Sequence, residues 1–144
     1  MKSTKFEIHE IVDKETIAWN NKDAEMLVSI FHPDMVWPWP ENAESHDPVN
    51  WVSPMGKFNH DRWKVAWQKL FDTHEPIHNR RNLLKIAITN EQDGAFAVVD
   101  VDTLWRNCNT GENLQWKGRA CKVYTKTGCE WKLISHIGLL NYSK

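Results

Sequence analysis

Several features that would assign this chain to a specialised class of protein are absent from its sequence. No apolar run is long enough to span a membrane, and there is no Gly-rich phosphate loop, internal repeat or low-complexity tract. The 18 basic residues nearly balance the 19 acidic ones, without a basic block of the kind that follows a phosphate backbone. We therefore expect neither a nucleic-acid partner nor a membrane partner.

Cysteine is scarce, and its spacing argues against a disulfide framework. Cys108, Cys121 and Cys129 form no C-x-x-C pair, and their odd number fits a reducing compartment. The first ten residues are charged and contain no apolar run, so no secretion signal is expected. These features predict a soluble cytoplasmic protein, and the length of 144 residues predicts a single domain, residues 1–144.

Tryptophan, by contrast, is abundant. The nine Trp residues supply large, rigid apolar surfaces, each with one N–H donor. Such side chains are common in cores, at interfaces and around flat ligands.

The beginning of the chain has the apolar periodicity of helices. Ser3 or Thr4 can cap a first helix that runs to about Asn20. Asp23 can cap a short second helix, which we expect to end at residues 32–34 because the proline there cannot continue the helical hydrogen bonds.

The next segment is expected to be extended and then irregular. Residues 35–40 carry Pro at alternate positions, which confines them to a sheet edge or a strand end. Residues 41–58 form a long loop, which is typical of a functional or mobile segment. Asn59 or Asp61 can then begin a third helix.

From residue 77 onward the pattern changes to strands separated by hairpin turns. The predicted strands are 77–90, 95–107, 113–126 and 129–140. Three helices, an early edge strand and a four-strand antiparallel meander make an α+β fold, in which a curved sheet wraps around the helices.

The second strand of this meander carries two carboxylates, Asp100 and Asp102, in an otherwise apolar sequence. Neither face of the strand is polar, so we expect both faces to be covered, one by the helices and one by another sheet or subunit. Buried carboxylates need partners, and the available cations are Arg119, Lys122 and His136. The residues alone leave three roles open for the pair: a catalytic base, the polar wall of a pocket, or a solvated face.

Residues 74–78 match the H-E-x-x-H pattern of zinc peptidases. That chemistry needs both His on one face of a continuous helix, and Pro76 would break such a helix. We therefore expect no metal at His74 and His78, and nothing else in the sequence implies a cofactor.

Two segments resemble the nuclear transport factor 2-like superfamily. They are AWNNKDAEMLVSIFHPDMVW, with the loop and helix after it, and WKGRACKVYTKTGCEWKLISHIG. The superfamily includes ketosteroid isomerase, SnoaL-like polyketide cyclases and the association domain of calmodulin-dependent kinase II. The resemblance implies a cone-shaped, cystatin-like fold, with a strongly curved, mostly antiparallel sheet around three N-terminal helices and a pocket. It also implies a homodimer through the outer face of the sheet.

Carried over by position, the resemblance to ketosteroid isomerase implies that its chemistry is lost. The place of its catalytic base corresponds to Trp39, that of its oxyanion-hole Tyr lies near Glu15, and that of its protonated carboxylic acid lies near Lys122. Isomerisation by that mechanism is therefore not expected. In the kinase association domain, the basic residues that line the pocket match Asp102, Lys122 and His136, which implies that these three face inward together.

Together these patterns predict a homodimeric small-molecule-binding domain with a deep Trp-lined pocket and a compact ligand, aromatic or carbonyl-containing. The predicted site consists of apolar walls, a mouth and a polar end: Trp19, Trp37 and Trp39; Met55 and Phe58; and Asp100, Asp102, Lys122 and His136. In the dimer, we expect Val99, Val101 and Trp105 to be buried between the subunits.

Two alternatives stay open. A SnoaL-like cyclase, isomerase or dehydratase would use Asp102 or His136 as general base, with Lys122 stabilising an enolate oxygen. A non-catalytic assembly module would have its cavity filled by Trp.

Overall fold

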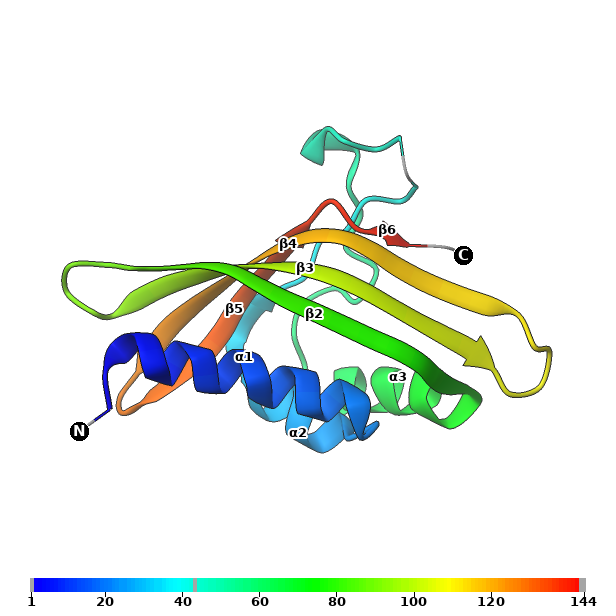
Figure 1. Ribbon diagram of the computed structural model, residues 1–144, viewed down its shortest axis with the longest axis horizontal. Helices are drawn as coiled ribbons and strands as arrows, with labels where there is room; N and C mark the ends of the chain where they lie inside the picture. The colour runs from blue at the N-terminus through cyan, green and yellow to red at the C-terminus, as the bar shows by residue number, and fades with distance from the viewer. Residues whose placement is uncertain (1, 43, 143–144) are drawn as a thin grey trace.

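Three helices pack along one face of a curved sheet in the computed structural model, which describes residues 2–42 and 44–142 (Figure 1). The elements, in chain order, are α1 (Thr4–Asn20), α2 (Ala24–Ser29), β1 (Phe31–Val36), the 3-10 turn η1 (Pro48–Asn50), α3 (His60–Thr73), β2 (His74–Ile88), β3 (Gly94–Asn107), β4 (Asn113–Thr127), β5 (Glu130–Gly138) and β6 (Asn141–Tyr142).

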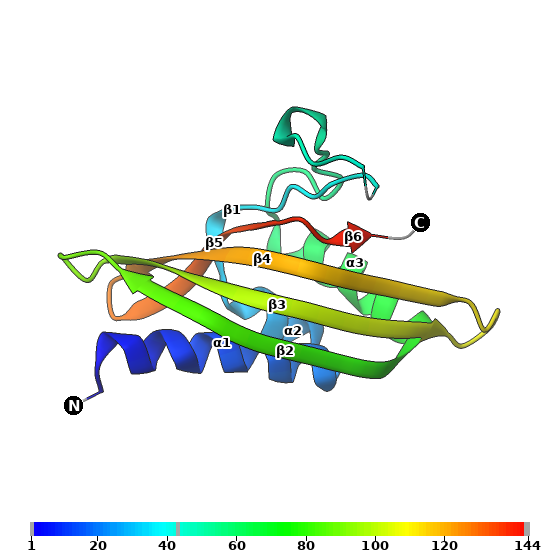
Figure 2. The same cartoon turned by 45° about the horizontal axis from the view of Figure 1, so that its top comes forward.

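The sheet follows the order β1-β5-β4-β3-β2, and the short β6 pairs with β4. β1 runs parallel to β5, and the other pairs are antiparallel. The long loop between β1 and α3 projects beyond the sheet near β6 (Figure 2). Within the described part of the chain, no helix is long and apolar enough to cross a membrane.

The predicted helix caps are confirmed. The side chains of Ser3, Asp23 and Asn59 each accept a hydrogen bond from a backbone N–H in the first turn of the following helix. The second helix ends earlier than predicted, at Ser29, and Pro33 lies inside β1. A proline is tolerated there because β1 is an edge strand, where one side needs no N–H donor.

The core consists largely of aromatic rings on the concave face of the sheet. Trp19 from α1 meets Trp67 from α3, with ring centroids 5.0 Å apart, and Trp116 from β4 at 5.5 Å, both nearly perpendicular to it. Trp63 and Trp105 are fully buried. Edge-to-face aromatic pairs of this kind add about 0.5–1.5 kcal/mol each beyond their buried area.

The face of β3 that was expected to lie between two subunits faces the helices of the same chain instead. Val99, Val101 and Trp105 are buried within the single chain, and the Trp105 ring lies 5.8 Å from that of Phe71 on α3. The expectation that these three residues lie between subunits is therefore wrong. Because side chains alternate along a strand, Asp100 and Asp102 must lie on the outer face.

A glycine allows the closest backbone approach in the sheet. Gly118 on β4 has φ +154°, and a Cβ atom there would lie 2.2 Å from the carbonyl oxygen of Leu139. The chain passes over β4 at this point on its way from β5 to β6, so only glycine fits.

Candidate ligand-binding site

A fully buried ion pair stands at the centre of the concave face. Lys122 on β4 donates hydrogen bonds of 2.7 Å to both carboxylate oxygens of Glu15 on α1, and both residues are no more than 2% exposed. Trp19 donates its indole N–H to the same carboxylate at 3.0 Å. These two positions, Glu15 and Lys122, match the places that the resemblance to ketosteroid isomerase singled out on the helix and the sheet.

The charge state of Glu15 follows from its neighbours. Burial alone would raise the pKa of Glu15, but the positive charges of Lys122 and Arg81 outweigh it and hold that pKa at about 2. Burial lowers the pKa of Lys122, and the Glu15 carboxylate limits that fall. The two groups form an ion pair in the neutral pH range.

Arg81 on β2 is a second inward-facing cation. Its guanidinium donates to Asn79 at 2.7 Å and to Thr103 at 3.3 Å, and it lies 3.9 Å from Glu15. It also lies over the ring of Trp19, 5.9 Å from its centroid. No pattern in the sequence distinguishes Arg81 from Arg80, whose side chain is exposed on the outer face.

His136 on β5 adds a neutral imidazole to this interior. Its ring stacks on Trp37 at 4.4 Å, and the residue is 3% exposed. Burial, together with the nearby charge of Lys122, holds the pKa of His136 well below its ordinary value. The imidazole is therefore uncharged near neutral pH, and its Nδ1 atom has no hydrogen-bond partner in the part of the chain that the structure describes.

A small void, here called the inner void, lies among these groups. Its volume is about 20 Å³, and its lining includes Trp37, Trp67, Arg81, Trp116 and His136. A space of this size holds about one water-sized atom. The deep pocket predicted from the sequence is thus nearly filled by tryptophan side chains.

A larger apolar cleft opens next to the inner void, and we call it the mouth cleft. It has a volume of about 450 Å³ and is lined by the long loop, by α3 and by β4. Its wall includes Trp39, Met55, Ala66, Leu70 and Leu114, together with Trp67 and Trp116, which also line the inner void.

Hydrogen bonds from side chains of α3 hold the long loop at the mouth cleft. Trp63 donates its indole N–H to the carbonyl of Met55 at 3.1 Å, and the Arg62 guanidinium donates to the carbonyls of Met55 and Lys57. On the other side of the loop, Trp39 and Val52 form an isolated antiparallel bridge. The predicted mouth residue Phe58 instead packs against Phe31 and Trp63.

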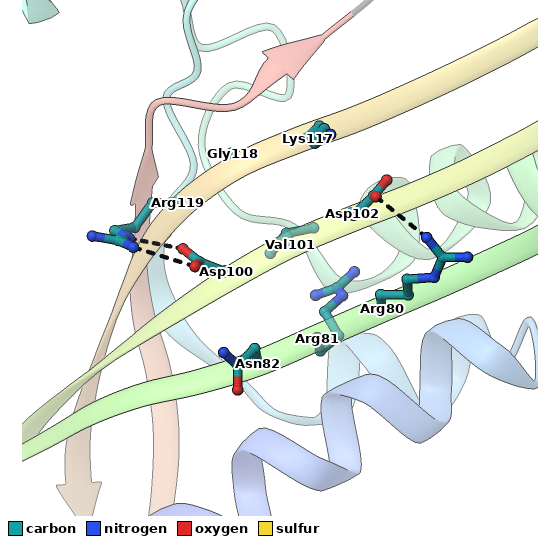
Figure 3. Close-up of a pocket in the computed structure, with 9 residues that line it drawn as sticks. All are labelled: Arg80, Arg81, Asn82, Asp100, Val101, Asp102, Lys117, Gly118 and Arg119. Atoms are coloured by element: carbon teal, nitrogen blue, oxygen red, sulfur yellow. Dashed lines mark hydrogen bonds and ion pairs between the residues drawn. The ribbon is translucent and has the colours of Figure 1, made fainter.

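Asp100 and Asp102 lie on the outer face of the sheet, opposite to the face that carries this site (Figure 3). Arg119 donates to Asp100 at 2.7 and 3.2 Å, and this hydrogen bonding lowers the pKa of Asp100. His78 lies 3.0 Å from Asp102, and hydrogen bonds from His78 and Gln115 lower the pKa of Asp102.

The expected inward pairing of Asp102 with Lys122 or His136 is therefore wrong. The outer face does hold an open hollow of about 560 Å³ beside these carboxylates. Both of its carboxylates are paired, Asp100 with Arg119 and Asp102 with Arg80 and His78, so neither is a free group for a ligand.

The H-E-x-x-H residues begin a strand and do not lie on a helix. His74 follows α3 directly, with its Nδ1 atom 2.8 Å from the Thr73 hydroxyl, and His78 is occupied by Asp102. This placement gives the two imidazoles none of the helical spacing that the zinc chemistry needs.

Of the predicted site residues, the structure brings Trp19, Trp37, Lys122 and His136 together in the interior, and Trp39 and Met55 at the mouth cleft. Sequence reasoning missed Glu15, the acid partner of Lys122, and the two Trp residues that line both the cleft and the void, Trp67 and Trp116. Glu15 could have been found, because it falls at a helical spacing from Ile11, Ala18 and Trp19 on the buried face of α1.

Comparison with known proteins supports the architecture. No family model matches the chain, and no curated protein matches it. Among solved structures, a ketosteroid isomerase-like protein from Erwinia carotovora atroseptica is 12% identical, with a TM-score of 0.71 over 100% of this chain and 99% of that one.

Two further structures have the same layout. An NTF2-like protein from Cytophaga hutchinsonii is 15% identical, with a TM-score of 0.66 over 99% of this chain and 100% of that one. A hexachlorocyclohexane dehydrochlorinase is 12% identical, with a TM-score of 0.66 over 96% of this chain and 86% of that one. The chain therefore has the nuclear transport factor 2-like fold that its sequence predicted, with three helices ahead of a curved, mostly antiparallel sheet.

Proposed function

We propose that this protein binds a compact, mainly apolar small molecule in the mouth cleft. The observation that carries the proposal is the cleft itself: about 450 Å³ of space walled by Trp39, Trp67 and Trp116. Ligand sites are usually apolar concavities of roughly 300–1,000 Å³ with a few convergent polar groups. Here the polar groups surround the inner void, which adjoins the cleft.

Filling the cleft tests the proposal. Ala66 lines the cleft from α3, whereas its neighbour Val65 is 68% exposed. In a calorimetric titration with 2-acetylnaphthalene as probe, we expect Ala66→Trp to abolish binding and Val65→Trp to retain it. Equal binding by both variants would place the ligand elsewhere and contradict the proposal.

Catalysis with His136 as general base is a second candidate function. It is supported by the neutral state of His136, by the free Nδ1 atom and by its position at the inner void. The dehydrochlorinase among the similar structures is an enzyme by its name, which is consistent with this candidate. Asp102 has no part in it, because it lies on the outer face, and Lys122 is bound by Glu15.

Proton exchange would test this candidate. His136 would take a proton from the carbon next to the carbonyl of a bound ketone, exchange that proton with solvent, and return a solvent-derived proton to the same carbon. In D₂O, the wild type should then replace the methyl protons of 2-acetylnaphthalene with deuterium, and His136→Gln should not. Exchange at the buffer rate in the wild type would leave binding as the only function.

We also propose that the outer face of the sheet pairs with a second copy of the chain. Val98, Cys121 and Ile137 form one cross-strand row on this face, and Phe96 pairs with Val123 in the next row. The ion pair of Asp100 and Arg119 adjoins them, so the surface offers both signs of charge to an identical partner.

Sedimentation tests this pairing. Ile137 is 39% exposed, and we expect Ile137→Asp to shift a dimeric wild type to monomer at micromolar concentration. Val65→Asp, on an exposed face of α3, is the matched control and should leave the dimer intact. A monomeric wild type would contradict the proposal.

A further inference from the structure

Three buried polar atoms beside the inner void have no hydrogen-bond partner among residues 2–42 and 44–142. They are the indole Nε1 atoms of Trp37 and Trp67 and the Nδ1 atom of His136. All three residues line the void, and each is at most 8% exposed. Buried polar groups in folded proteins are nearly always satisfied, by protein, by ordered water or by a ligand.

The hydrogen-bond donors around the void favour an oxygen atom over other occupants. Two indole N–H groups are donors only, so they call for an acceptor. Arg81 and Glu15 also line the void, but their opposite charges lie 3.9 Å apart and offset each other. The two indole donors therefore select the occupant.

The size of the void limits what that oxygen belongs to. A volume of about 20 Å³ accommodates one oxygen atom and leaves no room for the second oxygen of a carboxylate. A carbonyl oxygen has two lone pairs, which matches the two indole donors.

The void adjoins the mouth cleft, because Trp67 and Trp116 line both spaces. We infer that the ligand is an apolar carbonyl compound, with its carbonyl oxygen in the inner void and its apolar body in the mouth cleft. This inference rests on the proposed function, because it assigns the cleft to the body of the same ligand.

A pair of matched probes tests the inference. 2-Acetylnaphthalene carries a carbonyl, and 2-ethylnaphthalene has nearly the same shape without one. One hydrogen bond contributes about two- to thirteen-fold in affinity, and two donors face the void, so the ketone should bind the wild type at least about five-fold more tightly. The infrared carbonyl stretch of the bound ketone should also fall below its frequency in an apolar solvent.

Two variants identify the donor. Trp67→Phe keeps an aromatic ring but removes one of the two N–H donors, so its preference for the ketone over 2-ethylnaphthalene should fall clearly below that of the wild type. Trp131→Phe is the control, because Trp131 also has a buried, unpartnered indole N–H but does not line the void. It should keep the preference for the ketone. If Trp67→Phe fails to fold, the infrared shift in the wild type still shows whether the carbonyl oxygen of the bound ketone accepts a hydrogen bond.

The outcomes separate this inference from the proposed function. Equal affinity for the two probes, with an unshifted carbonyl stretch, would overturn the carbonyl assignment and leave apolar binding in the cleft standing. Tighter binding of 1-(2-naphthyl)ethanol than of the ketone would also overturn it, in favour of a hydroxyl. Failure of all three probes to bind would overturn the proposed function and the inference with it.

Discussion

Removal of the Glu15 carboxylate should destabilise the fold severely, because it leaves Lys122 charged in the protein interior. The pKa of Glu15 falls from 4.5 to about 2, which corresponds to about 3 kcal/mol of favourable interaction with the ionised form. Breaking a buried ion pair by removing one partner typically costs about 3–5 kcal/mol. We therefore expect Glu15→Gln to lower the free energy of unfolding by about 3–5 kcal/mol.

A double-mutant cycle shows whether the pair itself is responsible. Lys122→Met should cost a similar amount, because Glu15 would keep only Trp19 as a hydrogen-bond donor and Arg81 at 3.9 Å. The double variant Glu15→Gln/Lys122→Met should cost clearly less than the two single changes together, by about 1–3 kcal/mol.

Guanidinium unfolding followed by Trp fluorescence measures these differences, and Asp100→Asn is the matched control. Asp100 is also paired, to Arg119, but on the outer face, where solvent screens the charges. The Asp100→Asn change should leave the guanidinium concentration at the unfolding midpoint almost unchanged. A Glu15→Gln variant within about 0.5 kcal/mol of the wild type would refute the account of a buried, charged pair.

Three further predictions concern other parts of the molecule. The pKa of His136 is held well below its ordinary value in the folded protein. As the pH falls below about 6.5, the unfolded chain therefore binds a proton at His136 that the folded chain does not bind. The free energy of unfolding should then decrease toward acid by up to about 1.4 kcal/mol per pH unit. Thermal melts should show this slope in the wild type and a flatter one in His136→Gln, and parallel slopes would contradict the burial of His136. Asp102→Asn should change neither the melting temperature nor probe binding appreciably, since Asp102 lies outside the cavity. Loss of probe binding would contradict this placement of Asp102. Gly118→Ala should cost at least about 2 kcal/mol by urea unfolding, because its Cβ would meet the Leu139 carbonyl, and a neutral effect would mean that the chain crosses β4 differently.

The fold was readable from the sequence because its signals are local. Ser3, Asp23 and Asn59 cap the helices as predicted, and the turn residues divide the second half into the four long strands observed. The predicted end of the second helix was too late, because Pro33 breaks a helix but is equally acceptable in an edge strand. Tertiary pairing with β5 decided between the two.

The site was readable only in part because it depends on which face of a strand turns inward. The inward face of β3 is the more apolar one, with Ala97, Val99 and Val101, and this favours an outward Asp102. The resemblance to the kinase association domain pointed the other way, and a shift of one residue exchanges the two faces completely. Pairings between distant elements, such as Glu15 with Lys122, leave no spacing signal in a single sequence.

Methyl resonances of methionine test ligand binding in the mouth cleft most directly. Met55 lines the cleft, whereas Met26 and Met35 do not. In protein labelled with ¹³C at the methionine methyl groups, titration with 2-acetylnaphthalene should shift the Met55 resonance saturably and leave those of Met26 and Met35 in place. An unmoved Met55 resonance at saturating probe, or equal shifts of all three, would contradict the assignment of the mouth cleft as the binding site.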